Sequence, residues 1–258
     1  MEGTKKRAVY KKEPVYSFKE LLKMVDLKYS NNVAYKYKKE VTSKNPEYVE
    51  KTYHQYTKDV KALSTSLLEL KYGGKKVALI GNNRYEWCVT YMAVTTGNMV
   101  IVPIDKALPD NEIENLITRS GAEVVFFDKK YNDVMLKLKK DNSNKVNTLI
   151  SMDDEKIFGM EKYSELLKNG YTLLENGSNK YEEIKPEAEK MSILLFTSGT
   201  TSTPKGVMLS QKNICSNLSD FSSWVKIYPK DTLLSFLPIH HTFECTITFL
   251  YGMYVEQQ

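Results

Sequence analysis

The middle of the chain alternates short apolar runs with amphipathic helical segments, and this alternation restricts the fold more than any other feature. The apolar runs, which we interpret as buried strands, lie at residues 77–80, 100–103, 124–127 and 148–152. Helical periodicity separates them at residues 84–96, 110–120 and 131–140. Strands that are apolar along their whole length are typical of parallel sheets with helices on both faces. The sequence therefore predicts an α/β protein whose largely parallel sheet is flanked by helices.

The segments before this alternation are less regular but still carry local signals. Ser17 and Glu20 have the spacing of a capping box at the start of a helix. Residues 33–37 and 48–53 are predicted to pair as two strands across a lysine-rich turn. Thr57 is predicted to cap the helix that precedes the first buried strand, and Asp110 is predicted to cap the helix at residues 110–120.

Composition divides the chain into four parts. We expect a basic N-terminal tail at residues 1–12 and a first α/β portion at about 13–152. The polar stretch at about 153–190 is interpreted as an exposed connection. A second α/β portion, with a sheet of its own, is expected at about 191–258.

The overall composition excludes several classes of protein. Hydrophobic residues make up 41% and charged residues 27% of the chain, as in soluble globular proteins. The net charge of +5 comes from lysines spread along the chain, so it does not indicate a nucleic-acid partner. Three widely spaced cysteines, Cys88, Cys215 and Cys245, favour buried thiols in a reducing compartment over disulfides or a metal site. No segment has the pattern of a signal peptide or a membrane span, so we expect a cytoplasmic protein.

A loop rich in glycine, serine and threonine follows the apolar run 193–196. It reads T-S-G-T-T-S-T-P-K-G from Thr197 to Gly206. Backbone amides and hydroxyl groups donate hydrogen bonds to phosphate, and a lysine adds a positive charge. Ligands of parallel sheets bind at the carboxyl ends of strands, which is where this loop is predicted to lie. We therefore predict a nucleotide site here.

The phosphate loop of NTPases does not explain this sequence. Pro204 occupies the position of the second glycine of that loop and has no amide proton to donate. Gly206 occupies the position of the hydroxyl residue that binds Mg²⁺ and has no side chain. Both groups are needed in such a site, so we reject this interpretation.

The order of residues from Thr197 to Val207 instead resembles the T-S-G-T-T-G-x-P-K-G-V signature of the AMP-forming acyl-adenylating superfamily. That superfamily includes acyl-CoA synthetases, luciferases and the adenylation domains of peptide synthetases. Ser202 is the one departure, because glycine is commonest there. Residues 233–244, L-L-S-F-L-P-I-H-H-T-F-E, resemble most closely the long-chain fatty acyl-CoA synthetases. A weaker likeness at residues 77–105 matches their first βαβ unit, to which we assign a structural role.

The resemblance implies roles for particular residues. The β- and γ-phosphates of ATP would bind to Thr197, Ser198, Gly199, Thr200, Thr201, Ser202 and Lys205. The acyl pocket and the reacting carboxylate would lie beside His241, Phe243 and Glu244, with His241 the candidate catalytic residue. His240 falls on a variable position of the family pattern.

The resemblance also implies a reaction. The carboxylate of a fatty acid attacks the α-phosphorus of ATP, pyrophosphate leaves, and the thiol of CoA takes the acyl group from acyl-AMP. ATP, Mg²⁺, CoA and a fatty acid are therefore the expected cofactors and substrates. The family's adenine and Mg²⁺ motif, its ribose-binding aspartate and its mobile lysine have no counterpart in residues 13–258, and we assign no metal ligand here. We expect the N-terminal part of a longer enzyme, inactive by itself.

Other interpretations stay open at this point. The chain could adenylate another carboxylic acid, such as an amino or aryl acid, although residues 237–244 argue against amino-acid adenylation. It could also be a non-catalytic remnant that binds acyl chains or a partner, which its early end favours. The basic residues of the segment 1–12 favour a solvated tail. The alternative is that this tail contacts anionic lipid, which would give the protein a membrane-peripheral location.

Overall fold

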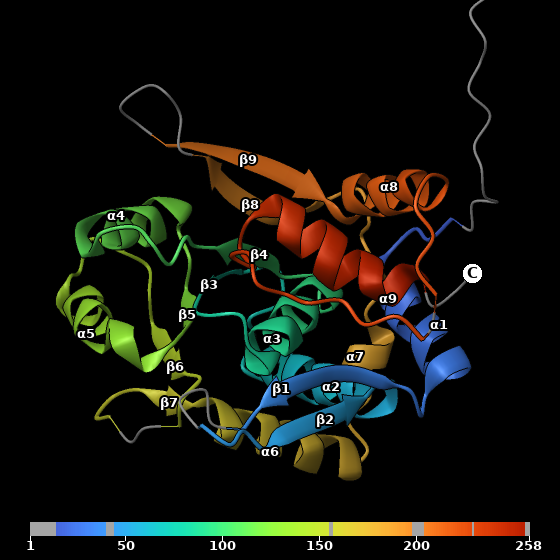
Figure 1. Cartoon of the computed structure of the whole chain (residues 1–258). Helices are drawn as coiled ribbons and strands as arrows, with labels where there is room; N and C mark the ends of the chain where they lie inside the picture. The colour runs from blue at the N-terminus through green and yellow to red at the C-terminus, as the bar shows by residue number, and fades with distance from the viewer. Residues whose placement is uncertain (1–13, 40–43, 155–156, 198–203, 229, 256–258) are drawn as a thin grey trace, which may run out of the picture.

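A seven-stranded sheet forms the centre of the molecule in the computed structural model, which describes residues 14–39, 44–154, 157–197, 204–228 and 230–255. The strand order is β7-β6-β5-β3-β4-β8-β9 (Figure 1). Neighbouring strands from β7 to β8 run parallel, and β9 pairs antiparallel with β8 at one edge. A separate two-stranded antiparallel sheet contains β1 and β2. The predicted fold class, an α/β protein with a largely parallel sheet, is confirmed.

The elements of the described chain have the following bounds. The strands are β1 (Val33–Lys38), β2 (Tyr48–Thr52), β3 (Lys76–Ile80), β4 (Val100–Pro103), β5 (Val124–Phe127), β6 (Thr148–Ser151), β7 (Glu161–Lys162), β8 (Met191–Thr197) and β9 (Lys205–Ser210). The helices are α1 (Phe18–Tyr29), α2 (Tyr53–Glu69), α3 (Tyr85–Thr96), α4 (Asp110–Ser120), α5 (Asn132–Lys140), α6 (Tyr163–Glu175), α7 (Lys180–Glu183), α8 (Gln211–Ser222) and α9 (Tyr251–Val255). A short 3₁₀ turn, η1 (Lys129–Tyr131), precedes α5, and a π-helix, η2 (Glu244–Leu250), precedes α9.

Alternate residues of the central strands enter two separate hydrophobic cores. Val77 and Leu79 of β3 belong to a core on one face, and Ala78 and Ile80 belong to a core on the other. Side chains of a strand point alternately to opposite faces, so this division follows from the strand geometry. Helices α4 and α5 cover one face, while α1, α2, α3 and α8 supply the core of the other (Figure 1). Burial on both faces explains why these strands are apolar throughout.

The strands and helices predicted from alternation agree with the structure, but two local predictions were wrong. Helix α2 begins at Tyr53 and not beyond Thr57, because Thr52 caps it and forms a reciprocal capping box with Gln55. Pro109, rather than Asp110, is the N-cap residue of α4.

The region after β6 differs from its interpretation as an exposed connection followed by a second sheet. Residues 157–190 contain β7, α6 and α7, and α6 packs on α2. Strand β8 pairs with β4, with Ile193 opposite Ile101, so it extends the first sheet and starts no new one. The apolar pattern of β8 specified a buried strand but could not specify its neighbour. The division of the chain near residues 152 and 191 stays a prediction.

Helices α2 and α6 approach closely at a glycine. A Cβ atom added to Gly170 of α6 would lie 1.9 Å from the carbonyl oxygen of Ala62 in α2. Near this contact Ser66 of α2 donates a hydrogen bond of 2.7 Å to the carbonyl oxygen of Leu166. Backbone atoms cannot rotate away as a side chain can, so only glycine permits this separation of the helices.

We predict that Gly170→Ala lowers the free energy of unfolding by at least about 2 kcal/mol, because the added methyl group forces the two helices apart. Urea denaturation of both proteins measures the change. Gly73→Ala is the matched control, because its Cβ would meet its nearest neighbour, Leu68 Cδ2, at 3.7 Å. The control should change stability by less than about 1 kcal/mol. Equal effects of the two substitutions would show that the close approach is not a constraint.

Candidate functional site

The predicted phosphate loop connects β8 to β9. Thr197 and Lys205 form the last residue pair of this antiparallel hairpin, so the two ends of the loop lie opposite each other. Both residues are exposed. The predicted contacts Ser198, Gly199, Thr200, Thr201 and Ser202 lie outside the described residues. The loop thus begins at the carboxyl end of a strand that runs parallel to β4, the location expected for ligand binding.

An arginine from α4 contacts the base of this hairpin. Arg119 donates a hydrogen bond of 3.0 Å from Nη2 to the carbonyl oxygen of Pro204, directly before Lys205. Its guanidinium carbon also lies 5.9 Å from the ring centroid of Phe196 in β8. Arg119 therefore contacts β8 and the residue that directly precedes β9, links the hairpin to the helix layer, and adds positive charge near the predicted phosphate site.

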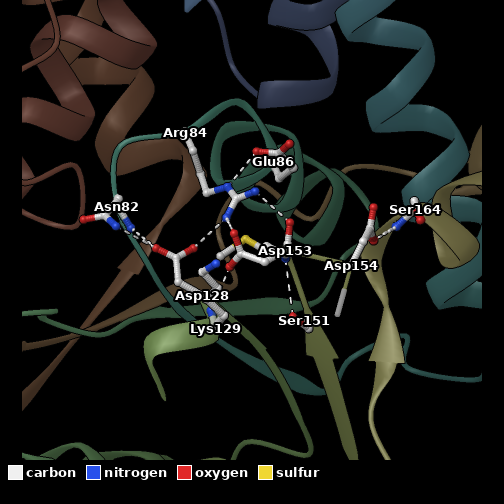
Figure 2. Close-up of polar contacts among 10 residues, drawn as sticks. Asn82, Arg84, Glu86, Asp128, Lys129, Ser151, Asp153, Asp154 and Ser164 are labelled. Atoms are coloured by element: carbon white, nitrogen blue, oxygen red, sulfur yellow. Dashed lines mark hydrogen bonds and ion pairs between the residues drawn. The ribbon is translucent and has the colours of Figure 1, made fainter. Parts of the chain in front are cut away.

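A second polar group, the Arg84 network, joins the carboxyl ends of β3, β5 and β6 (Figure 2). Arg84 contacts three carboxylates: Nη1 lies 3.0 Å from Asp128 Oδ1 and 2.9 Å from Asp153 Oδ1, and Nε lies 2.7 Å from Glu86 Oε2. Its Nη2 atom donates to the carbonyl oxygen of Met152 at 2.7 Å. The other oxygen of Asp128 accepts bonds of 2.7 and 3.0 Å from the backbone and side chain of Asn82.

The electrostatics of this network follow from burial and charge pairing. Burial disfavours the charged form of Arg84, but Glu86, Asp128 and Asp153 outweigh that effect and raise its pKa. Burial raises the pKa of Asp128, while the Asn82 amide and Arg84 act in the opposite direction. Arg84 therefore stays protonated, and its bonds to Asp128 and to the Met152 carbonyl link the end of β3 to the ends of β5 and β6.

The segment that carries His240 and the predicted site residue His241 meets the loop after β4. His240 is half-buried, and its Nε2 atom lies 3.2 Å from Asp105 Oδ1. His241 and Phe243 are exposed, whereas Glu244 is 1% exposed and accepts a hydrogen bond of 3.0 Å from Thr248. The structure thus places His240, which the family pattern leaves variable, in contact with the sheet, and His241 toward solvent.

Two buried polar atoms of this segment have no hydrogen-bond partner within the described residues. They are His240 Nδ1 and Glu244 Oε1. Buried side-chain polar atoms are usually paired, and an unpaired one carries a desolvation cost of about 1–3 kcal/mol. Two such atoms within five residues indicate that this segment carries a cost in folding stability, which is common at functional sites.

A cavity of about 610 Å³ lies beside the same segment. Its wall includes Tyr35 of β1, Cys88 of α3, Leu233 and Ile239 of the segment, and Phe249 of η2. The volume is within the range of about 300–1,000 Å³ that is usual for small-molecule sites, and apolar side chains from several elements contribute. None of His241, Phe243 and Glu244 is among the lining residues.

The sequence analysis assigned residues 77–105 a structural role, named no site residue in the loops after β5 and β6, and so missed this polar arrangement. Its members are Asn82, Asn83 and Arg84 after β3, Asp105 after β4, Asp128 after β5 and Asp153 after β6. Each follows an apolar run within a few residues, and the ends of parallel strands meet at one edge of a sheet. That signal was available in the sequence. The pairing of Arg84 with carboxylates from two other loops was not, since it requires the strand order.

The described residues contain neither a metal-binding cluster nor a membrane-spanning helix. No group of three or more His, Cys, Asp or Glu side chains in that part of the chain is arranged to hold a metal ion. Among the helices of the described ranges, none has the length and apolar character needed to cross a bilayer. The three cysteines are free and buried, as predicted.

Comparison with known proteins gives consistent results. The family model described as AMP-binding enzyme matches residues 27–257. Long-chain-fatty-acid–CoA ligase 5 of Rattus norvegicus is 32% identical over 206 residues, which cover 75% of this chain and 30% of the rat protein. Long chain acyl-CoA synthetase 4 of Arabidopsis thaliana is 28% identical over 236 residues, covering 85% of this chain and 34% of the plant protein. The chain therefore spans about a third of the length of these curated relatives.

Solved structures share the fold. The N-terminal domain of FACL13 from Mycobacterium tuberculosis superposes with a TM-score of 0.76 at 22% identity, over 93% of this chain and 55% of that chain. The anthranilate CoA ligase AuaEII, in complex with anthranoyl-AMP, gives a TM-score of 0.80 at 16% identity, over 99% of this chain and 45% of that chain. At these identities the likeness establishes the fold.

We predict that the free energy of unfolding falls as the pH is lowered from about 7.5 to about 5, and that it falls less in His240→Gln. Burial lowers the pKa of His240 below its ordinary value of 6.5, an effect that Asp105 opposes and that His241 and Lys106 reinforce. Below pH 6.5 the unfolded chain therefore binds a proton that the folded chain binds more weakly, which favours unfolding.

Urea denaturation at a series of pH values measures this effect. The difference between wild type and His240→Gln isolates the histidine, because both proteins contain the same carboxylates. Parallel pH profiles for the two proteins would contradict the prediction.

Proposed function

This chain belongs to the AMP-binding enzyme family, and we propose that it is the N-terminal part of an ATP-dependent ligase that activates a fatty acid as acyl-AMP and transfers it to CoA. The observation that carries the proposal is the placement of the Thr197–Val207 signature on the β8–β9 hairpin. The similarity to long-chain-fatty-acid–CoA ligases supports the substrate class.

The proposed first step depends on charge and position. A carboxylate attacks the α-phosphorus of ATP, forms a new P–O bond, and displaces pyrophosphate. Lys205 would neutralise charge on the β- and γ-phosphates as they leave, and Thr197 with the residues after it would donate hydrogen bonds. Arg119 supports the loop through Pro204. Mg²⁺ stays an expectation from the family, and no described residue is assigned to it.

The cavity of about 610 Å³ is the proposed site of the acyl chain. Ile239, which lines the cavity, lies only two residues before His241, and we propose that the carboxylate end of a fatty acid in the cavity points toward His241, Phe243 and Glu244. We keep His241 as the proposed residue nearest the carboxylate and Phe243 and Glu244 as neighbours of the pocket. A thiol, that of CoA, then attacks the acyl carbonyl and AMP leaves. We propose a cytoplasmic location, with a membrane-peripheral one as the alternative.

The nearest alternative keeps the adenylation step but changes the acid. ATP–pyrophosphate exchange by the full-length protein, measured with long-chain fatty acids, aryl acids and amino acids in parallel, separates the two. We expect exchange with fatty acids to exceed exchange with the other classes by at least about tenfold, since the relatives carry that substrate class and tenfold corresponds to only 1.4 kcal/mol. Exchange with amino or aryl acids alone would favour the alternative. Binding of the fatty acid without any pyrophosphate exchange would favour a non-catalytic protein.

We predict that Lys205→Ala in the full-length protein lowers the rate of ATP–pyrophosphate exchange by about 10- to 100-fold, because a charged hydrogen bond of about 1.5–3 kcal/mol to phosphate is lost. Lys137→Ala on α5 is the matched control, since Lys137 is also an exposed lysine, near Glu114 at 3.6 Å. The control should exchange at the wild-type rate. An unchanged rate in Lys205→Ala would refute the assignment of the loop.

A further inference from the structure

The polar side chain of Asn83 bridges the loop after β3 to a segment more than 150 residues later in the chain. Its Nδ2 atom donates hydrogen bonds to Ser235 Oγ at 2.9 Å and to the carbonyl oxygen of Leu237 at 2.7 Å. Its Oδ1 atom accepts a bond of 3.1 Å from the backbone amide of Ile239. One carboxamide therefore contacts three residues of a five-residue stretch, which we call the clamped segment (235–239).

The clamped segment depends on such contacts. Residues 232–238 belong to no helix or strand, so no regular backbone ladder fixes them. Leu234 and Phe236 are largely exposed, at 79% and 73%, and contribute little packing. Ile239 is the exception, because it is buried and its amide is the one that bonds to Asn83. The position of the chain here is therefore set mainly at Asn83 and Ile239.

The backbone that presents Asn83 is rigid for a reason already visible in Figure 2. Both neighbours of Asn83 are tied to Asp128: Asn82 through its amide and side chain, and Arg84 through its guanidinium. Arg84 is in turn held by Asp153 and Glu86. Asn83 thus lies between two anchored residues, and its carboxamide is presented from the end of the central strand β3 with little freedom to move.

Asn83 and the clamped segment also share the cavity. Asn83, Ser235 and Ile239 all line it. The segment continues through Pro238 into His240 and His241, and His240 contacts Asp105 in the neighbouring loop after β4. Displacement of residues 235–239 would therefore change the wall of the cavity and also the positions of His240 and His241, which follow it in the chain.

We propose that Asn83 is a positioning residue for the acid substrate: it holds the clamped segment against the sheet and thereby sets the shape of the cavity that receives the acyl chain. The assignment rests on the proposed function of the cavity. Asn83 does not touch the reacting atoms in this proposal, and it acts on binding of the acid through residues 235–239. The β8–β9 hairpin, where ATP phosphates are proposed to bind, has no bond to Asn83 within the described chain.

The test compares Asn83→Ala with Asn144→Ala in the full-length protein. Asn144 is a matched control, because it also donates two hydrogen bonds to backbone carbonyls, of Leu138 and Asp141, and accepts one from Val146. It lies between α5 and β6 and is not among the residues lining the cavity. Asn83→Asp is a second variant of similar shape, which keeps the acceptor for Ile239 but loses both donors.

Two readouts are measured. In ATP–pyrophosphate exchange, Asn83→Ala should raise KM for the fatty acid about tenfold, as expected for the loss of several partly exposed hydrogen bonds, with KM for ATP within about twofold of wild type. In hydrogen–deuterium exchange, the amides of residues 235–241 should exchange faster in Asn83→Ala and at the wild-type rate in Asn144→Ala. Asn83→Asp should raise KM for the acid while protecting the Ile239 amide more than Asn83→Ala does.

The outcomes separate this proposal from the proposed function. Equal changes in KM for acid and ATP, an unchanged KM for the acid, or unchanged exchange at residues 235–241 would each overturn the role of Asn83. Should Asn83→Ala not fold, the split between the two KM values in Asn83→Asp decides in its place. If wild type itself shows no acid-dependent pyrophosphate exchange, the proposed function has failed, and hydrogen exchange alone decides whether Asn83 holds the segment.

Discussion

The contact of Arg84 with Asp128, Asp153 and Glu86 is the interaction on which this side of the molecule depends. Arg84 is half-buried, and placing an arginine partly out of water among carboxylates costs desolvation energy that its attraction to them offsets only if the geometry is good. Here the guanidinium donates from three nitrogen atoms to partners 2.7–3.0 Å away. Glu86 lies in α3, while Asp128 follows β5 and Met152 and Asp153 follow β6, so the bonds of Arg84 link the end of β3 to the ends of its parallel neighbours β5 and β6. The order of the parallel strands therefore determines which loops Arg84 can connect, and Arg84 in turn fixes the positions of these loops.

Parallel strands end on the same side of a sheet, and this brings separate functional elements together. The loop where we propose that the ATP phosphates bind follows β8, Asp105 follows β4, and the Arg84 network joins the ends of β3, β5 and β6. The clamped segment is bonded to the same edge through Asn83. A nucleotide held by the hairpin and an acid held in the cavity would therefore approach each other over one edge, which is the geometry that in-line attack on the α-phosphorus needs.

How far the sequence could predict this arrangement depends on the range of the interaction concerned. Strands β3 to β6 were predictable because burial on both faces leaves an apolar run of four or five residues, and the signature of Thr197–Val207 was predictable because it is continuous. Helix α6 was missed because its buried stripe is short and includes Gly170, which has no hydrophobic side chain to detect. The partner of β8, the carboxylates of Arg84 and the contacts of Asn83 join loops far apart in sequence, and no local pattern encodes them.

The region around His240 shows why the identity of a functional histidine is harder to predict than the position of its segment. The segment leads into the π-helix η2, a rare conformation that occurs frequently at functional sites. It also contains two buried polar atoms without partners in the described chain, His240 Nδ1 and Glu244 Oε1. Conformational and desolvation costs of this kind persist where the rest of the structure, or a ligand, requires them. The costs fall on His240 and Glu244 and not on the exposed His241. The contact of half-buried His240 with Asp105 therefore argues that His240 fixes the chain, and the exposed His241 is the imidazole that we propose lies nearest the carboxylate.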